Sequence, residues 1–323
     1  MMLLAASVIA KVPGIDSGFF RLAFFLKLVS NGLVNGAVYA LMALTVVIIY
    51  RTTSHLNFAQ GEMATFGAFI VFALAIQQGI PYVFAIIIAM VISMVAGAGF
   101  ERFLVRPVEK RSALGVVIVT LGLFLTLNAF TAAIWGTESV DVLKPFPGGL
   151  GDKFTFMDGP PQFFVTYKAV GIWITLAVLV IALWWLLQHT KLGLAYRAVA
   201  SNRESSLAVG IPVGRMLMLG WAISAGIGTL AAVLISEQSN NLDFNLMGVV
   251  LLYGFAAAAL GGFDSIVGAV VGGMIVGLVE ALVPQLFTFI GSELSLAMAL
   301  AIIVIVLLVR PQGIFGTKRI ERV

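Results

Sequence analysis

The sequence contains no cysteine and only two histidines in 323 residues. Without cysteine the chain can form no disulfide bond and carry no thiol chemistry. It has neither a His-Glu-x-x-His motif nor a zinc cluster, so we expect no metal site. A Gly-x-x-x-x-Gly-Lys-Ser/Thr motif is also missing, so the chain cannot bind ATP through a P-loop of its own. We find no catalytic constellation and predict that the protein is not an enzyme and needs no cofactor.

Charge is scarce as well. Only 11% of the residues are charged, against about 25% in a soluble domain, and 61% are hydrophobic. Two of the apolar runs, 63–76 and 247–260, are short for a crossing of about 20 residues. The pattern predicts an all-α, polytopic transmembrane helical bundle of about eight spans with interrupted helices. The apolar runs cover residues 28–50, 63–76, 82–103, 113–135, 169–188, 214–235, 247–260, 266–283 and 294–309.

Polar breaks at 51–62 and 261–265 interrupt this pattern, and each stands between two apolar runs. Unwound backbone at membrane depth must line a cavity or be covered by protein. Paired interrupted segments in the two halves of a membrane protein are typical of a transport site between structural repeats. We therefore consider a structural repeat, although the residues of the two halves are only weakly similar. Glycines at Gly32 and Gly36, and again between 268 and 277, are spaced for close helix packing.

Polar residues within or beside the spans are candidates for lining a solute pathway. Eight are selected: Asn31, Asn35, Tyr39, Asn57, Gln60, Glu62, Thr120 and Asn128. The first three are spaced i, i+4, i+8 and therefore share one helix face. Hydrogen bonding between helices explains the asparagines equally well, and helix capping explains Glu62 equally well. For Glu280, one turn before Pro284, we expect contact with interfacial water instead of a role in transport.

The longest polar segment between spans covers residues 191–212. Apolar residues recur at helical spacing from Leu192 to Val199, which predicts one face of a short helix. Asn202 can cap a second short helix, with Glu204 in its first turn. Gly210 suits the left-handed residue at which this helix ends. The segment therefore predicts a compact unit of two short helices; the alternative is a solvated loop between two spans.

The lysines and arginines predict the orientation. With 191–212 in the cytoplasm, thirteen of the 19 lie on the cytoplasmic side and six lie outside. The amino terminus and the loop 136–168 are therefore expected outside, and the carboxyl terminus inside. We divide the chain into an external or interfacial segment 1–27, a membrane domain 28–316 and a basic cytoplasmic tail 317–323. Because the basic residues are scattered along one membrane face, we expect lipid and no nucleic acid as a partner.

Four stretches carry a resemblance to a known family. They are 56–62 (LNFAQGE), 193–211 (GLAYRAVASNRESSLAVGI), 258–263 (AALGGF) and 309–316 (VRPQGIFG). In this order they resemble the permeases of ABC importers of the branched-chain amino acid type, from about Asn31 to Gly316. The first stretch is closer to the LivH-type subunit than to its LivM-type partner.

The resemblance implies half of the channel of an importer in the bacterial inner membrane. It implies a second, LivM-type permease, two ABC ATPase subunits that hydrolyse ATP, and an external solute-binding protein. Segment 191–212 would dock in a groove of an ATPase, with Tyr196 and Val199 of its first short helix and Leu207 and Val209 of its second on the docking face. The candidate coupling residues are Tyr196, Arg197, Val199, Asn202, Arg203, Glu204 and Leu207.

Sparse charge inside the spans suits a small neutral or zwitterionic solute. The resemblance makes branched-chain amino acids the first candidates; urea, short amides and other small carboxylates are carried by similar permeases. The alternative is a secondary transporter or channel that works without ATPase subunits. That alternative explains the spans and the paired breaks but not segment 191–212.

Overall fold

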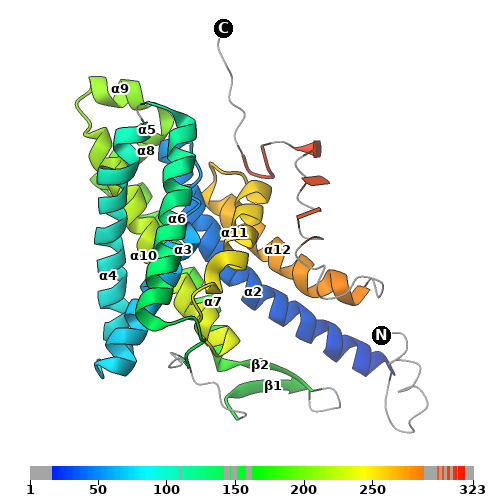
Figure 1. The fold of residues 1–323 in the computed structure, drawn as a ribbon. Helices are drawn as coiled ribbons and strands as arrows, with labels where there is room; N and C mark the ends of the chain where they lie inside the picture. Colours follow the sequence, from blue (N-terminus) through cyan, green and yellow to red (C-terminus); the bar gives the residue numbers. More distant parts are fainter. Residues whose placement is uncertain are drawn as a thin grey trace.

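The computed structural model describes residues 17–109, 111–141, 146, 151–157, 162–286 and parts of 297–316. Within these residues, seven helices are long and apolar enough to cross a membrane, and the apolar helix Leu246–Gly261 is shorter. The predicted all-α membrane bundle is confirmed (Figure 1). The tail 317–323 and residues 1–16 lie outside the described residues.

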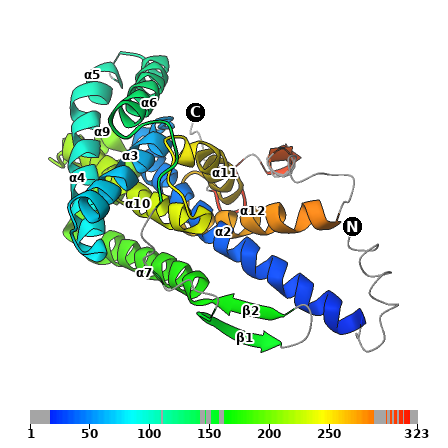
Figure 2. The same ribbon diagram turned by 60° about the horizontal axis from the view of Figure 1, so that its bottom comes forward.

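The helices and strands follow one another along the chain in one series. They are α2 (Ser17–Thr53), α3 (Gln60–Phe72), the π-helix η1 (Ala73–Gln77), α4 (Tyr82–Phe100), the π-helix η2 (Glu101–Val105), α5 (Arg106–Glu109), α6 (Ala113–Trp135), β1 (Lys153–Met157), β2 (Phe163–Thr166), α7 (Tyr167–His189), α8 (Lys191–Ser201), α9 (Arg203–Ala208), α10 (Val213–Ser239), α11 (Leu246–Gly261) and α12 (Ile266–Leu286). Helices α5, α8 and α9 lie at one end of the bundle and the β1–β2 hairpin at the other (Figures 1 and 2).

Helix α2 occupies the centre of the bundle. In its most apolar 18-residue stretch 89% of the residues are buried. The corresponding share is 22% in the spans that contain α4 and α6, so these two helices face the surroundings. Helices α7, α10, α11 and α12 all pack against α2. The helix begins at Ser17, earlier than the expected start of the span at residue 28. After Gly18 no proline or glycine occurs before Gly32, so nothing in the sequence ends the helix sooner.

Glycines bring α2 and α12 into close contact. A Cβ atom added at Gly277 would lie 2.3 Å from the backbone nitrogen of Gly36, and one added at Gly273 would lie 2.4 Å from the Cα of Ala40. A Cβ atom added at Gly32 would likewise meet the carbonyl oxygen of Gly277. The predicted glycine packing surface is confirmed, because only residues without a side chain allow two helix backbones to approach so closely.

The two predicted breaks meet at one end of the bundle. The first joins α2 to α3, and the second joins α11 to α12 through Gly262, whose φ is +105°. The ring of Tyr50, just before the first break, and the ring of Phe263, within the second, are 4.9 Å apart. The stretch 309–316 contacts the end of α11 beside the second break. The backbone nitrogen of Ile314 donates to the carbonyl of Leu260 at 2.8 Å. Two stretches that carry the family resemblance are thus in contact, while the structural repeat stays a prediction.

The described part of loop 136–168 contains the antiparallel hairpin β1–β2. Lys153 lies over the ring of Phe164 at 4.5 Å and thereby covers one face of β2. An isolated bridge between Val140 and Leu242 ties the loop to the turn before α11. Figure 2 shows the hairpin beside the ends of α2 and α7.

The α2–α12 contact generates a stability prediction. Gly277→Ala places a methyl group against backbone atoms that cannot move aside, and overpacking of this kind costs about 1–3 kcal/mol. Gly122→Ala is the matched control, since a Cβ at Gly122 on α6 meets nothing within 4 Å. We expect a lower melting temperature in detergent for Gly277→Ala and an unchanged or higher one for Gly122→Ala. Equal melting temperatures for the two variants would contradict this packing.

Candidate functional site

The first polar cluster holds the start of α3 inside the bundle. The side-chain oxygen of Asn57 accepts from the backbone nitrogen of Ala59 at 3.0 Å, and its amide nitrogen donates to Gln60 Oε1 at 3.2 Å. Gln60 Nε2 in turn donates to the carbonyl of Ser224 on α10 at 3.2 Å. Asn57 and Gln60 are buried, and through Gln60 they join the break to α10.

A second cluster surrounds Glu62 on α3. Asn128 Nδ2 on α6 lies 3.3 Å from Glu62 Oε2, 3.0 Å from Asn245 Oδ1 and 3.3 Å from the carbonyl of Phe244. Glu62 is buried, and no ion pair with a lysine or arginine is formed by it among the described residues. The side chain of Asp243 accepts from the backbone nitrogen of Asn245 and adds a further negative charge at this end of α11. The cluster is therefore rich in acceptors for a cationic group.

A third cluster surrounds Glu280, for which contact with interfacial water was expected. Its Oε2 accepts from Asn35 Nδ2 at 3.0 Å and from the hydroxyl of Tyr39 at 2.8 Å. Gln238 on α10 donates to the side-chain oxygen of Asn35. Asn35 and Tyr39 do share one face, as predicted, but that face meets a carboxylate that we had assigned to interfacial water. A carboxylate within a span is costly in hydrocarbon. This cost was the signal in the sequence that pointed to Glu280.

The remaining two pathway candidates lie apart from these clusters. Asn31 borders a cavity of about 250 Å³ between α2, β2, α7 and α10. Its polar and charged lining residues are Lys27, Ser30, Asn31, Thr166, Lys168 and Gln238. The hydroxyl of Thr120 donates to the carbonyl of Val117 in its own helix and reaches none of the three clusters.

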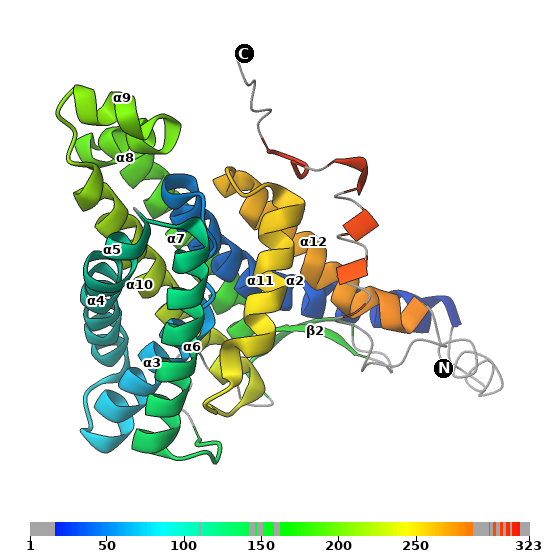
Figure 3. The same cartoon turned by 45° about the horizontal axis from the view of Figure 1, so that its top comes forward.

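The predicted pair of short helices in 191–212 is confirmed. Helix α8 is capped by Thr190, and Asn202 Oδ1 caps α9 by accepting from the backbone nitrogen of Ser205 at 2.9 Å. Gly210 has φ +82°, a left-handed conformation that glycine adopts without strain. Figure 3 shows α8 and α9 together at one end of the bundle. We call these two helices the α8–α9 unit.

The apolar face of α8 points inward, contrary to the expected docking role of Tyr196 and Val199. Both are only 1% exposed, and the Tyr196 hydroxyl donates to the carbonyl of Ile48 on α2. Burial raises the pKa of this hydroxyl, which keeps it neutral and able to donate. The exposed large apolar residues of segment 191–212 are Leu192 at 51% and Leu194 at 62% on α8, Leu207 at 61% on α9, and Val209 at 75% just after α9. Helical spacing identifies a face but not the surface that it contacts.

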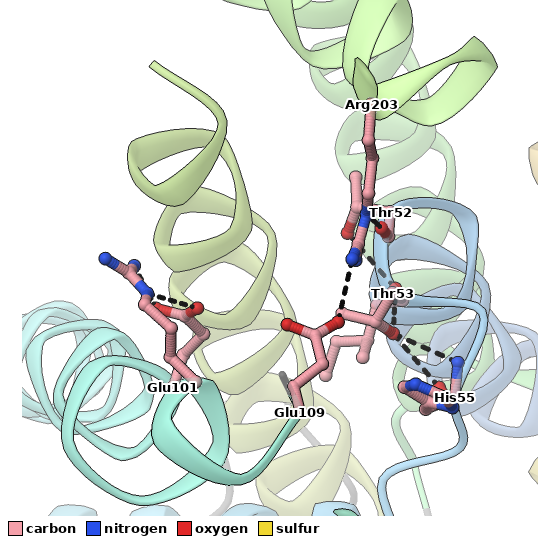
Figure 4. Close-up of polar contacts among 8 residues, drawn as sticks. Thr52, Thr53, His55, Glu101, Glu109 and Arg203 are labelled. Atoms are coloured by element: carbon pink, nitrogen blue, oxygen red, sulfur yellow. Dashed lines mark hydrogen bonds and ion pairs between the residues drawn. The ribbon is translucent and has the colours of Figure 1, made fainter. Parts of the chain in front are cut away.

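The charged candidates of the α8–α9 unit also differ in their surroundings. Arg203 forms an ion pair with Glu109 and donates to the carbonyl of Thr52, so its guanidinium is bound inside the chain (Figure 4). Arg197 donates to Gln188 at 2.7 Å on the exposed side of α7. Asn202 and Glu204 are exposed. In this structure the partners of Arg203 thus lie within the chain itself.

Long apolar helices around a buried central span, with polar clusters between them, define a multi-pass membrane protein. The model of a family described as branched-chain amino acid transport system / permease component matches residues 28–308. The chain therefore belongs to this family of transport permease components, which are not catalytic subunits.

The curated relatives agree in length and subunit type. The permease protein LivH of a high-affinity branched-chain amino acid transport system in Escherichia coli K12 is 29% identical over 312 residues, covering 93% of this chain and 98% of the relative. LivH of Salmonella typhimurium is 28% identical with the same coverage. BraD of Pseudomonas aeruginosa, a permease protein of a system with the same description, is 28% identical over 308 residues and also covers 93% and 98%.

The position of Tyr196 predicts the behaviour of core variants in the α8–α9 unit. Tyr196→Ala removes a buried ring together with its hydrogen bond to α2, and we expect a loss of about 3–5 kcal/mol in the free energy of unfolding. Tyr196→Phe keeps the ring and should cost about 1 kcal/mol. Leu207→Ala, at an exposed position, should leave the melting temperature in detergent unchanged. A folded, fully stable Tyr196→Ala protein would argue against this anchoring contact.

Proposed function

We propose that the chain is a permease subunit of an ABC importer that carries a small neutral or zwitterionic solute, with branched-chain amino acids as the first candidates. The observation that carries this proposal is the family match over residues 28–308 together with relatives of the same length. The α8–α9 unit supports it, because Leu207 and Val209 present an exposed apolar surface that a partner groove would bury.

The proposal includes an assembly and an orientation. A second, LivM-type permease would complete the channel, two ABC ATPase subunits would bind the α8–α9 unit, and an external solute-binding protein would deliver the solute. The bias of lysine and arginine supports an external amino terminus and a cytoplasmic carboxyl terminus in a bacterial inner membrane. ATP is bound and hydrolysed by the ATPase subunits, and transport follows when closure of the ATPase pair moves the two permeases.

The carboxylates of Glu62 and Glu280 suggest how a zwitterionic solute is received. Each accepts hydrogen bonds from amide or hydroxyl groups, and among the described residues neither is paired with a lysine or arginine. Such a carboxylate in a membrane domain retains capacity for a cationic group. We propose that the ammonium group of the solute passes the cluster of Glu62, Asn128 and Asn245, where three elements meet.

A reconstituted complex tests the function. The chain is assembled in vesicles with a LivM-type permease, two ABC ATPase subunits and a solute-binding protein. We expect leucine, isoleucine and valine to stimulate ATP hydrolysis and to accumulate inside only when ATP is present. Urea and acetamide in the same assay distinguish amino acids from other small solutes. Uptake by the permeases without any ATPase subunit would favour the alternative, a secondary transporter or channel.

A pair of variants on α6 tests the proposed pathway. Asn128→Ala removes the amide that joins Glu62 to Asn245 and should lower the uptake rate about tenfold, the effect of one lost hydrogen bond to a charged group. Thr120→Val is the matched control on the same helix, because its hydroxyl bonds only within α6. Wild-type uptake rates in both variants, measured in the reconstituted complex, would remove this cluster from the pathway.

A further inference from the structure

The starting observation is the position of the Arg203 side chain. Arg203 is the first residue of α9, and its Nη1 lies 2.9 Å from Glu109 Oε1 at the end of α5. Its Nε donates to the carbonyl of Thr52 in the last turn of α2. Figure 4 shows the side chain extending from α9 toward both partners at once. One guanidinium thus joins three segments that are far apart in the sequence.

Both partners lie at positions from which a displacement can spread into the membrane domain. Thr52 belongs to the end of the central helix α2, where carbonyl groups lack partners within the helix and carry partial negative charge. The next residue, Thr53, bonds through its hydroxyl to Ile49 and to His55 and so fixes the start of the break. The break then leads directly into α3, which carries Glu62.

The contact to Glu109 reaches the other side of the bundle. Glu109 ends α5, which continues α4 through η2. Arg106 in the same segment is ion-paired with Glu101 and donates to the carbonyl of Gly214 at the start of α10. Segment α5 is therefore joined to α9 by Arg203 and to α10 by Arg106. A shift of α9 relative to α10 would pull on α5 from both sides.

The chemistry of this contact differs from that of an ordinary surface ion pair. The side chains of Arg203 and Glu109 are 34% and 11% exposed, so water screens the pair only in part. A guanidinium presents several donors in one rigid plane and can hold a carboxylate and a carbonyl together, which a lysine ammonium does less well. Arg203 is thus suited to hold α5 and the end of α2 to α9, so that both follow when the α8–α9 unit moves.

We propose that Arg203 is a positioning residue that transmits movement of the α8–α9 unit to the end of α2 and to α4–α5. This inference rests on the proposed function, in which an ATPase subunit moves that unit. The outer surface of the unit, with Leu207 and Val209, would bind the ATPase, and Arg203 on its inner side would pass the displacement on. Loss of Arg203 should therefore separate ATP hydrolysis from solute uptake without releasing the ATPase.

The experiment measures ATP hydrolysed per solute transported in the reconstituted complex. For Arg203→Gln we expect normal co-purification of the ATPase subunits, hydrolysis within about twofold of wild type, and uptake reduced about tenfold, the effect of one charge-assisted hydrogen bond. Arg203→Lys keeps the charge, and its uptake should fall between that of wild type and that of Arg203→Gln. The matched control is Arg111→Gln, which removes an exposed arginine from the same end of the bundle and should leave the ratio unchanged.

A charge exchange separates transmission from simple folding. Glu109→Arg alone should raise the ratio, and the double variant Arg203→Glu with Glu109→Arg should recover part of the uptake, because the ion pair is restored while the bond to Thr52 is not. Melting temperatures are measured for every variant. An unchanged ratio for Arg203→Gln, or a loss of uptake that only follows a loss of stability and is not recovered by the exchange, would overturn the inference alone. A wild-type chain that binds no ATPase subunit would overturn the proposed function itself.

Discussion

The close approach of α2 to α12 is the contact on which the arrangement of the bundle depends. Glycines at Gly36, Gly273 and Gly277 let the two backbones touch, so the helices pack over a long stretch of α2. Because the helices are so close, Asn35 and Tyr39 of α2 donate hydrogen bonds to the carboxylate of Glu280 on α12. Helices α10 and α11 also pack against α2. Apolar surfaces alone attract weakly in lipid, and the precision of backbone packing therefore decides which polar groups can meet.

The carboxylates of Glu62 and Glu280 are bound by amide and hydroxyl donors. Glu62 accepts a hydrogen bond from Asn128, and the buried Gln60 donates one to α10. The interrupted start of α3 is therefore covered by protein. Among the described residues neither Glu62 nor Glu280 forms an ion pair with a lysine or arginine, and neutral donors orient both carboxylates. This arrangement suits a membrane protein that must receive a polar solute and release it again.

The α8–α9 unit has two surfaces with different surroundings. Tyr196 and Val199 anchor the inner surface to the membrane domain, and Arg203 extends the anchor to α2 and α5. Leu207 and Val209 remain exposed on the outer surface. The unit is thus attached to the membrane domain on one side and presents apolar side chains on the other.

The sequence by itself determined the features that depend on composition and on local geometry. Apolar runs required membrane helices, Asn202 and Gly210 marked the ends of α9, and four short stretches indicated the family. The tertiary structure alone decided which surface each face contacts. Tyr196 lies 148 positions from the residue that accepts its hydroxyl, and Glu280 lies 241 positions from Tyr39. Helical periodicity reports that residues share a face, but the neighbour of that face is set by the packing of the whole chain.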